Sequence, residues 1–563
     1  EKKCKSCGST QHKSIYSQEC PNHIPLHERA RDSTNRMSLA GRLKDKRCLE
    51  VINSALDAYH TLRYYSSLFV LGHAIRVMCL GLRPPEVTET YLRSVWCLLR
   101  SDASSTREST KPTPELLETA RQLNLPLIDC TGLAQLLSAN KTLIVKDYNN
   151  HNESDKIKAH MAMYVRAKYD IARGHGTAVS EKVLANNVGQ FRTLPKTLEG
   201  TVEQWNQRVE ELHAEYIELT HEWVVSKDKD GKEKRNFKIT PVKLQLYRFH
   251  MMCTINEANK QLKARGADYL FRQIKLLPTA EAGRKYANLD DATVLALKAR
   301  ARMVYPELLE TTMVETNKRN KNGSFRVVNV KTHPLDPLFQ SLESVFVLGD
   351  KPGAKAGKNP AKWRPGRSVK TNGLQLHITY ETLNSERKTV GARKGQKAKM
   401  EGHSTKPSEY DPSYDFSKVP RDIREQDIRV HDPGNSAPFT WTSKDDDGEH
   451  IFGGISKAEY NHRSKRGKKN RKHARDAKRT AIDKTYAYLA GFTLRTCSWP
   501  EMRSAIRAFV QNHASLHRFN SRKPWLKMQF EADQAEQRAI NHVINRVLRG
   551  KGPKRKRLHR NQR

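Results

Sequence analysis

The sequence lacks any apolar run long enough to cross a membrane. Its most apolar segment, residues 68–82, is interrupted by His73 and Arg76. It is also shorter than the ~20 residues that a membrane-spanning helix needs. We therefore predict a buried helix in this segment and no membrane partner.

Cysteines are few and irregularly placed. The chain has nine, of which three precede residue 21 and six are scattered: Cys48, Cys79, Cys97, Cys130, Cys253 and Cys497. An odd, dispersed set argues against a disulfide framework and favours a reducing compartment. A secretory signal peptide is lacking as well. Because the chain begins with Glu1 rather than Met, we expect trimming at the N-terminus, and we consider it at the C-terminus too.

Acidic residues are far fewer than basic ones. The 563 residues include 101 Lys and Arg but only 61 Asp and Glu, which gives a net charge of +40. Such an excess repels itself unless a polyanion neutralises it. Phosphate backbones are the partner we expect, through release of their counterions. The alternative is a solvated basic surface, although the excess exceeds what solubility requires.

Length and composition predict several domains in a multidomain α+β fold. Hydrophobic residues make up 37% of the chain, which is sufficient for folded cores. The boundaries we predict are 1–25 (a Cys/His unit), 26–150 (mostly helical), 151–323 (helical), 324–382 (strands), 383–425 (linker), 426–550 (a second α+β unit) and 551–563 (basic tail).

Local patterns predict individual elements. Leu49, Ile52, Leu56 and Tyr59 recur at helical spacing, and so do Trp205, Val209, Leu212, Tyr216 and Leu219. Residues 325–331 and 374–380 have the composition of strands, whereas residues 351–373 are rich in Lys, Gly and Pro and predict a loop. Residues 227–235 predict a polar turn between elements.

Residue 426 opens a unit in which Asp432 is the candidate catalytic residue. We predict strands at 427–432, 439–442 and 450–452, then helices at 456–480, 482–491, 499–514 and 526–549. Three antiparallel strands followed by helices are typical of the start of an RNase H-like fold. Asp432 precedes a Pro-Gly turn, and Mg²⁺ sites that hydrolyse phosphodiesters are built from such carboxylates. The alternative is an ordinary Asp-Pro-Gly turn.

The partner carboxylates of such a site are not evident after Asp432. The residues considered are Asp445, Asp446, Asp447, Glu449, Glu459, Asp476, Asp483, Glu501, Glu531, Asp533 and Glu536. None follows a predicted fourth or fifth strand, and Glu531, Asp533 and Glu536 fit the solvated face of a helix. We expect the second and third ligands to lie beyond Arg563.

Residues 463–479 predict a strongly basic helix. They contain ten Lys or Arg and one acid: Arg463, Lys465, Arg466, Lys468, Lys469, Arg471, Lys472, Arg475, Lys478 and Arg479. No face is apolar enough to stabilise the helix by packing, so we predict that it lies along a phosphate backbone. The alternative is a disordered or nuclear-import segment.

The N-terminal unit predicts a structural zinc site. Cys4 and Cys7 have CxxC spacing, and Cys20 adds a third thiolate. His12 is the preferred fourth ligand, with His23 as the alternative. At the other end, residues 553–560 resemble a nuclear-import signal, which would indicate the nucleus. The alternative is a basic run without that role, as arises in a chain of this charge. His221-Glu222 does not complete an HExxH motif, so no metalloprotease is indicated.

Two segments together resemble a known family. Lys370-Thr-Asn-Gly-Leu-Gln-Leu-His-Ile-Thr-Tyr380, followed by Arg429-Val-His-Asp-Pro-Gly434, is similar to the transposon-encoded TnpB nucleases. The N-terminal knuckle, the basic tail and the large helical insert look most like Fanzor, the eukaryotic branch, which is related to type V CRISPR effectors. The specific match covers residues 331–480.

The resemblance implies an RNA-guided DNA endonuclease that works as a monomer in a ribonucleoprotein with guide RNA and double-stranded target DNA. It implies a helical recognition lobe inserted in a β-barrel wedge domain, then an RNase H-like RuvC domain. Asp432 would be the first RuvC carboxylate, and 456–480 would include the bridge helix. Lys362, Trp363 and Arg364 would lie in a wedge-domain loop that meets nucleic acid.

The family's second glutamate, final aspartate and paired CxxC ribbon are not found in this sequence. Trimming accounts for all three absences, and so does natural loss of the nuclease. We therefore hold two hypotheses: a Mg²⁺-dependent RNA-guided nuclease, and a non-catalytic RNA-guided DNA binder. As printed, the chain is expected to bind guide and target but not to cut.

Overall fold

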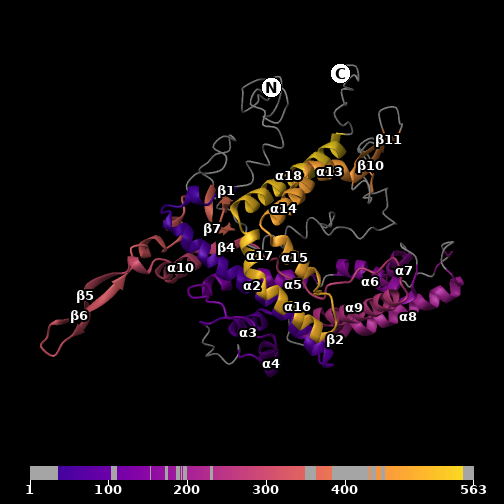
Figure 1. Ribbon diagram of the computed structural model, residues 1–563, viewed down its shortest axis with the longest axis horizontal. Helices are drawn as coiled ribbons and strands as arrows, with labels where there is room; N and C mark the ends of the chain where they lie inside the picture. The colour runs from indigo at the N-terminus through magenta and orange to yellow at the C-terminus, as the bar shows by residue number, and fades with distance from the viewer. Residues whose placement is uncertain are drawn as a thin grey trace, which may run out of the picture.

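A computed structural model describes residues 36–102, 111–151, 154–171, 175–185, 191, 193–194, 199–227, 233–348, 363–382, 430–432, 439–444 and 450–549. Within these ranges the protein combines long helices with small antiparallel sheets (Figure 1). The predicted α+β class is confirmed at this level. None of the described helices has the length and apolar character needed to cross a lipid bilayer.

Most of the described residues up to residue 304 are helical. The elements are η1 Ala40–Arg42, α2 Arg47–Cys79, α3 Glu89–Leu99, α4 Pro114–Leu123, α5 Ala134–His151, α6 Ser154–Tyr169, α7 His175–Leu184, α8 Val202–Thr220, α9 Pro241–Ala264 and α10 Asp291–Val304. The predicted amphipathic face of α8 is confirmed, because Trp205, Val209, Leu212 and Tyr216 are buried.

The long helix α2 forms the centre of the structure. It is buried on nearly all sides from Tyr64 to Met78, as expected of a helix that is apolar all round. The buried helix predicted over residues 68–82 is thus confirmed, although it ends at Cys79. Gly81, at φ +71°, takes the left-handed position that closes the helix, where its N–H bonds the carbonyl of Met78.

A four-stranded sheet draws its strands from distant parts of the sequence. Its order is β1 (Arg36–Ser38), β8 (Gln375–Thr382), β7 (Trp363–Thr371) and β4 (Ala287–Asp290), with all neighbours antiparallel. Helices α2 to α9 therefore lie, in sequence, between the two edge strands of one sheet.

The turn from β7 to β8 is a close-packed part of this sheet. Asn372 accepts a hydrogen bond from the backbone of Gln375 at 3.0 Å. Gly373 has φ +85°, and a Cβ there would lie 2.3 Å from Nη1 of Arg284. Only glycine satisfies both conditions. The loop predicted over 351–373 is wrong in its second half, because residues 363–371 form β7.

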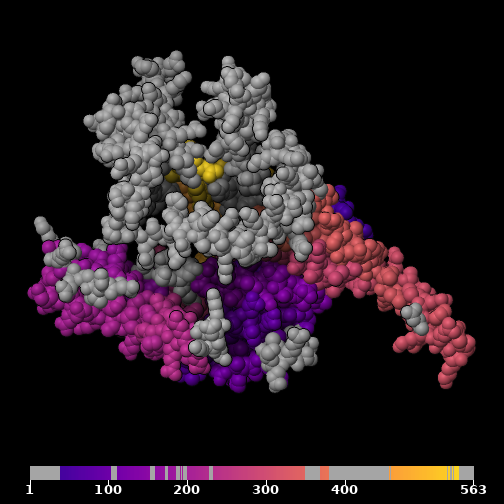
Figure 2. Space-filling model, turned by 180° about the vertical axis from the view of Figure 1, so that it is seen from behind, coloured from indigo at the N-terminus to yellow at the C-terminus, as the bar shows by residue number. Residues whose placement is uncertain are grey.

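Two hairpins interrupt the region predicted to be helical. They are β2 (His221–Lys227) with β3 (Glu233–Ile239), and β5 (Glu310–Arg319) with β6 (Phe325–Thr332). The predicted strand at 325–331 is confirmed as β6. The prediction that residues 151–323 are helical is wrong at β2, β3 and β5, which are strands. β-branched and aromatic residues such as Trp223 and Val225 favour extended backbone here. Figure 2 shows the β5–β6 hairpin standing clear of the rest of the molecule.

After β6 the chain makes two short turns of helix before the four-stranded sheet closes. They are η4 (Asp336–Leu338) and α11 (Leu342–Val345), while η3 (Pro306–Leu308) precedes β5. Val345 and Phe346 are buried in the core, and their backbone pairs with residues 43–44, which follow η1.

The last part of the chain begins with a three-stranded antiparallel sheet of order β11-β10-β9. The three predicted strands are confirmed, with other bounds. The elements are β9 Val430–Asp432, β10 Phe439–Lys444, β11 His450–Ile455, α13 Lys457–Arg463, α14 Arg466–Arg479, α15 Ile482–Ala490, α16 Trp499–Gln511, α17 His513–Asn520 and α18 Lys523–Arg549.

The single helix predicted over residues 456–480 is wrong. The chain breaks between α13 and α14 at Ser464, which is fully buried, and at Lys465, which has φ +56°. The helix predicted over 499–514 is also two helices, α16 and α17. In both places tertiary packing decides where the helix stops, since neither break contains Gly or Pro.

One hydrophobic core runs through most of these elements. It extends from Leu39, before α2, to Val510 on α16. α16 packs directly on α2 at Gly72, where an added Cβ would lie 2.6 Å from Cδ1 of Ile506. The C-terminal helices are therefore fixed to the N-terminal helical region.

A polar cluster fixes α17 to α2. The carboxylate of Asp57 accepts hydrogen bonds from Arg284 at 2.6 and 3.0 Å and lies 2.9 Å from Nε2 of His517. Burial raises the pKa of Asp57, but hydrogen bonding from His517 and the charge of Arg284 outweigh it, so the pKa lies below the ordinary value. Nearby, the ring of His513 stacks on Tyr64 at 4.5 Å.

Replacing Gly72 with valine should destabilise the protein by roughly 1–3 kcal/mol, because the added methyl groups force α2 and α16 apart. The melting temperature of the purified protein measures this effect. Gly467→Ala is the matched control, since no atom lies within 4 Å of its Cβ position. An unchanged melting temperature for Gly72→Val would contradict the close α2–α16 contact.

Acid should weaken the packing of α17 on α2. Burial, reinforced by His517, lowers the pKa of His513 from 6.5 to about 4. Below pH ~6.5 His513 is protonated in the unfolded chain but stays neutral in the folded protein. The free energy of unfolding therefore decreases as the pH falls, until the pH reaches the pKa of His513 in the folded state. His513→Phe should make this fall shallower by up to roughly 1.4 kcal/mol per pH unit.

The measurement is thermal unfolding of wild type and His513→Phe between pH 4 and pH 7. His462→Phe serves as the control, because His462 is exposed on α13. Parallel pH profiles for wild type and His513→Phe would show that His513 does not titrate in this way.

Candidate nucleic-acid interface

The predicted basic residues are concentrated on α14 and on the bend before it. Eight of the ten are exposed, and Lys469 and Lys472 are half-buried. Within the part of the chain that the structure describes, only Arg463 and Arg466 form ion pairs. The other eight form no ion pair with a described carboxylate.

α14 is held to the protein by one narrow face. His473 lies against Trp525 with ring centroids 4.3 Å apart, and against Phe519 at 5.1 Å. One turn further on, Ala477 is buried in a small cluster with Leu516 and Phe519. The prediction that packing cannot stabilise this helix is therefore wrong: residues 473 and 477, four apart, supply a packed face.

The half-buried Lys469 belongs to the same face. Its ammonium lies 5.5 Å from the centre of the Trp525 ring, a cation–π distance. Lys469, His473 and Ala477 thus form one row at four-residue spacing, and this row fixes which way α14 is rotated. Apart from Arg466, which pairs with Glu536, the remaining lysines and arginines of α14 are left for solvent or a ligand.

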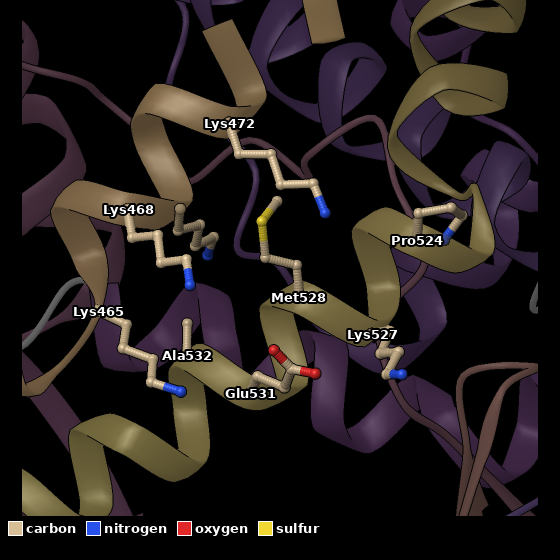
Figure 3. Close-up of a pocket in the computed structure, with 9 residues that line it drawn as sticks. Lys465, Lys468, Lys472, Pro524, Lys527, Met528, Glu531 and Ala532 are labelled. Carbon is tan, nitrogen blue, oxygen red and sulfur yellow. The ribbon is translucent and has the colours of Figure 1, made fainter. Parts of the chain in front are cut away.

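A lysine-lined groove lies between α14 and α18. Its volume is about 260 Å³, and five of its lining residues are lysines: Lys465, Lys468, Lys469, Lys472 and Lys527. Glu531 is the single acid in the lining, beside Pro524, Met528 and Ala532. In Figure 3 the side chains of Lys465, Lys468 and Lys472 extend from the α14 side toward α18, and Lys527 projects from α18 at the other side of the space. Ammonium groups gathered in this way suit phosphate oxygens.

The helices that form the groove approach closely because α18 presents small residues. Ala532, Ala535 and Ala539 are buried along one side of α18. Glu536, from the same helix, pairs with Arg466 and accepts a hydrogen bond from Tyr460 at 3.3 Å. The prediction that Glu536 belongs to a solvated face is therefore wrong, since it joins α18 to both α13 and α14.

Asp432 is the last residue of β9. Its backbone lies opposite Thr440 of β10, which lies opposite Gly454 of β11. Two strand spacings place this position ~10 Å from Gly454, close to where β11 runs into α13. Among the described strands β9 is at the edge of its sheet.

The sheet that carries Asp432 also contacts α18. Ile455, at the end of β11, is fully buried and packs with Val543 of α18 and Tyr460 of α13. Helix α18 therefore connects two features that the sequence treats separately, the β9–β11 sheet and the lysine groove (Figure 1).

The remaining predicted site residues either lie on β7 or fall outside the described residues. Trp363 and Arg364 begin β7, paired with Thr382 and Glu381, so their assignment to a loop is wrong. Lys362 and the zinc candidates Cys4, Cys7, His12, Cys20 and His23 lie outside the described residues. In the described ranges, no group of three or more His, Cys, Asp or Glu side chains is placed to hold a metal ion.

Sequence reasoning missed the residues that α18 contributes. Lys527 completes the groove, and Trp525 supports His473 and Lys469. A signal for them existed in residues 522–527, Arg-Lys-Pro-Trp-Leu-Lys, where an aromatic residue is interleaved with basic ones. Which helix this segment faces is a tertiary property.

No protein-family model matches the chain, and comparison with curated protein sequences gives no match. The function is therefore inferred from these residues.

Replacing Lys468, Lys472 and Lys527 together with alanine should weaken binding to nucleic acid. The expected change is a shallower slope of log affinity against log salt, by up to about 0.9 for each duplex phosphate that these lysines neutralise. Fluorescence anisotropy with a labelled duplex at several salt concentrations measures this slope.

The matched control replaces Lys318, Lys321 and Lys331 of the β5–β6 hairpin with alanine. These lysines are exposed, and their replacement removes the same amount of charge. Equal reductions of affinity in the two variants would mean that net charge, rather than the groove, determines binding.

Proposed function

We propose that the chain is an RNA-guided DNA endonuclease resembling Fanzor and TnpB. Guide RNA would pair with one strand of a double-stranded DNA target beside a short motif, and a RuvC-type site would cleave it. The observation that carries the proposal is the lysine groove between α14 and α18, built on the helix that also supports the sheet of Asp432.

The order of the described strands supports the RuvC part of the proposal. An RNase H-like domain starts with three antiparallel strands followed by helices, and the chain has β9, β10 and β11 followed by α13 to α18. In the described residues one edge of β9 is unpaired, so a further strand could add there.

The path of the chain supports an inserted recognition lobe. The chain leaves a sheet after β1 and returns to it at β4, having formed α2 to α9 in between. The family-like Thr371-Asn372-Gly373 segment forms the turn that closes this sheet. These strands are the proposed wedge domain, in which Lys362, Trp363 and Arg364 would contact nucleic acid.

The groove would hold a phosphate backbone without reading its sequence. Five ammonium groups from two helices can contact successive phosphates of a hybrid duplex, while base pairing supplies specificity. Arg471, Arg475 and Lys478 are exposed on α14 and would extend the contact.

Magnesium would supply an activated water and stabilise the leaving oxygen during cleavage. Asp432 would contribute one oxygen ligand. The described residues do not form a complete metal site, so no cleavage step is derived through them. We further propose a structural zinc bound by Cys4, Cys7, Cys20 and His12 or His23, and a nuclear location directed by the basic tail.

The second candidate is an RNA-guided DNA binder that does not cleave. The lysine groove serves both candidates, since contact with phosphates requires no metal. The sequence shows no evident second or third carboxylate partner for Asp432, and both candidates are compatible with this.

In the full-length protein with its copurified RNA, Asp432→Asn should reduce cleavage of target DNA by at least ~10³-fold and leave its affinity within about twofold. The amide keeps the size of the carboxylate but removes the charge that Mg²⁺ needs. Cleavage is measured by gel electrophoresis of labelled DNA with Mg²⁺, and binding in Ca²⁺.

Asp427→Asn is the control, and it should leave cleavage unchanged. Loss of DNA binding in Asp432→Asn would assign Asp432 a structural role. Guided binding without cleavage in the wild-type protein would establish the second candidate.

A further inference from the structure

Three cysteines that are distant in sequence meet where α2, α9 and α16 come together. Cys79 is the last residue of α2, Cys253 lies on α9, and Cys497 lies just before α16. The thiol of Cys79 donates a hydrogen bond to the carbonyl of Cys497 at 3.1 Å. The thiol of Cys253 donates to the sulfur of Cys497. Cys79 is exposed, and Cys253 and Cys497 are half-buried.

Asn256 completes this arrangement. It follows Cys253 by three residues on α9 and therefore lies on the same face. Its amide nitrogen lies 3.7 Å from the sulfur of Cys497 and donates to the carbonyl of Arg495 at 3.3 Å. Gln273 donates to the amide oxygen of Asn256 at 3.1 Å, which turns the nitrogen toward Cys497.

Two donors, a thiol and an amide, therefore point at the sulfur of Cys497. Hydrogen bonds to a sulfur stabilise its thiolate, and the bond from Cys253 lowers the pKa of Cys497 to about 6. The same contact raises the pKa of Cys253, which stays protonated as the donor. Burial raises the pKa of Cys79. Of the three, Cys497 has the character of a nucleophile, and Cys253 is the thiol placed to react with it after oxidation.

We propose that Cys497 and Cys253 form an oxidation site at which a hydroperoxide is reduced and the two thiols become a disulfide. This site goes beyond the proposed function and does not depend on it. The sequence alone does not indicate it, since the two cysteines are separated by most of the chain's second half.

The chemistry proceeds in two steps. The Cys497 thiolate attacks the outer oxygen of the peroxide, the O–O bond breaks, and the departing hydroxide takes a proton to become water. The Cys253 sulfur then attacks the Cys497 sulfenic acid, the S–O bond breaks, and a second water leaves. Two thiols lose two electrons, and hydrogen peroxide gains them as it becomes two waters.

The disulfide would join α9 to the segment before α16. These are parts of the helical region and of the C-terminal helices, which in the reduced protein meet here through hydrogen bonds such as the one from Asn256 to Arg495. A covalent link would hold them together. Cys79, exposed and next to Cys497, is placed to reopen the bond by thiol exchange.

The first test uses the reduced wild-type protein and iodoacetamide. A thiol of pKa about 6 should be alkylated roughly tenfold faster at pH 6 than a free cysteine in a reference peptide, with the ratio shrinking toward pH 8. Mass spectrometry reads each cysteine separately, with Cys97 as the internal comparison. Cys253→Ser and Asn256→Leu should each slow the alkylation of Cys497 at pH 6 and shift the pH dependence of its alkylation rate to higher pH.

The second test uses stoichiometric hydrogen peroxide and peptide mapping without reductant. The expected product is a Cys253–Cys497 linked peptide that disappears on reduction. Cys497→Ser should abolish it, whereas Cys97→Ser should not. In Cys253→Ser, dimedone should trap a sulfenic acid on Cys497.

Three results would overturn the proposal: alkylation of Cys497 no faster than of Cys97, a linked peptide through other cysteines only, or a metal ion that shields Cys497 until a chelator removes it. The wild-type measurements keep the test valid if a variant fails to fold.

Discussion

One carboxylate, that of Asp57, connects the parts of this structure that are farthest apart in sequence. It accepts two N–H groups of Arg284 and contacts His517, while Arg284 also donates to Asn53 at 2.9 Å and packs against Gly373. The long helix, the segment before β4, the β7–β8 turn and α17 therefore meet at one point. Because Asp57 is half-exposed, this contact contributes little to the free energy of folding, and its main effect is to fix the relative positions of these segments.

The position of the lysine groove follows from this contact. α17 is held at His517, and Phe519, two residues later, supports His473 of α14. The chain then turns directly into α18, whose Trp525 supports the same histidine. The orientation of α14 relative to the core is thus transmitted through a short run of aromatic contacts, and a nucleic acid in the groove would be positioned by them.

The sequence predicted those helices and strands that hydrophobic periodicity and local composition determine. The buried α2, the packed face of α8, and strands β6 and β8 to β11 follow from periodicity and composition. The break at Lys465 could not be predicted, because lysine favours helix and the bend is set by Glu536 of α18, which binds both Tyr460 and Arg466. The sequence likewise shows which residues of α14 are basic. It does not show that α18 packs beside α14 and contributes Lys527 and Trp525, because that contact is non-local. The meeting of Cys253 with Cys497 is non-local too.

The groove itself is the strongest reason to expect a polyanionic partner. Five lysines surround about 260 Å³ with one glutamate among them, so like charges oppose the approach of α14 to α18. The ring contact of His473 with Trp525, the buried alanines of α18 and the Arg466–Glu536 pair hold the helices together against this repulsion. A surface that needed only solubility would let these lysines spread apart. Apolar and aromatic contacts that force them together make a site whose positive charge a polyanion such as a phosphate backbone would neutralise.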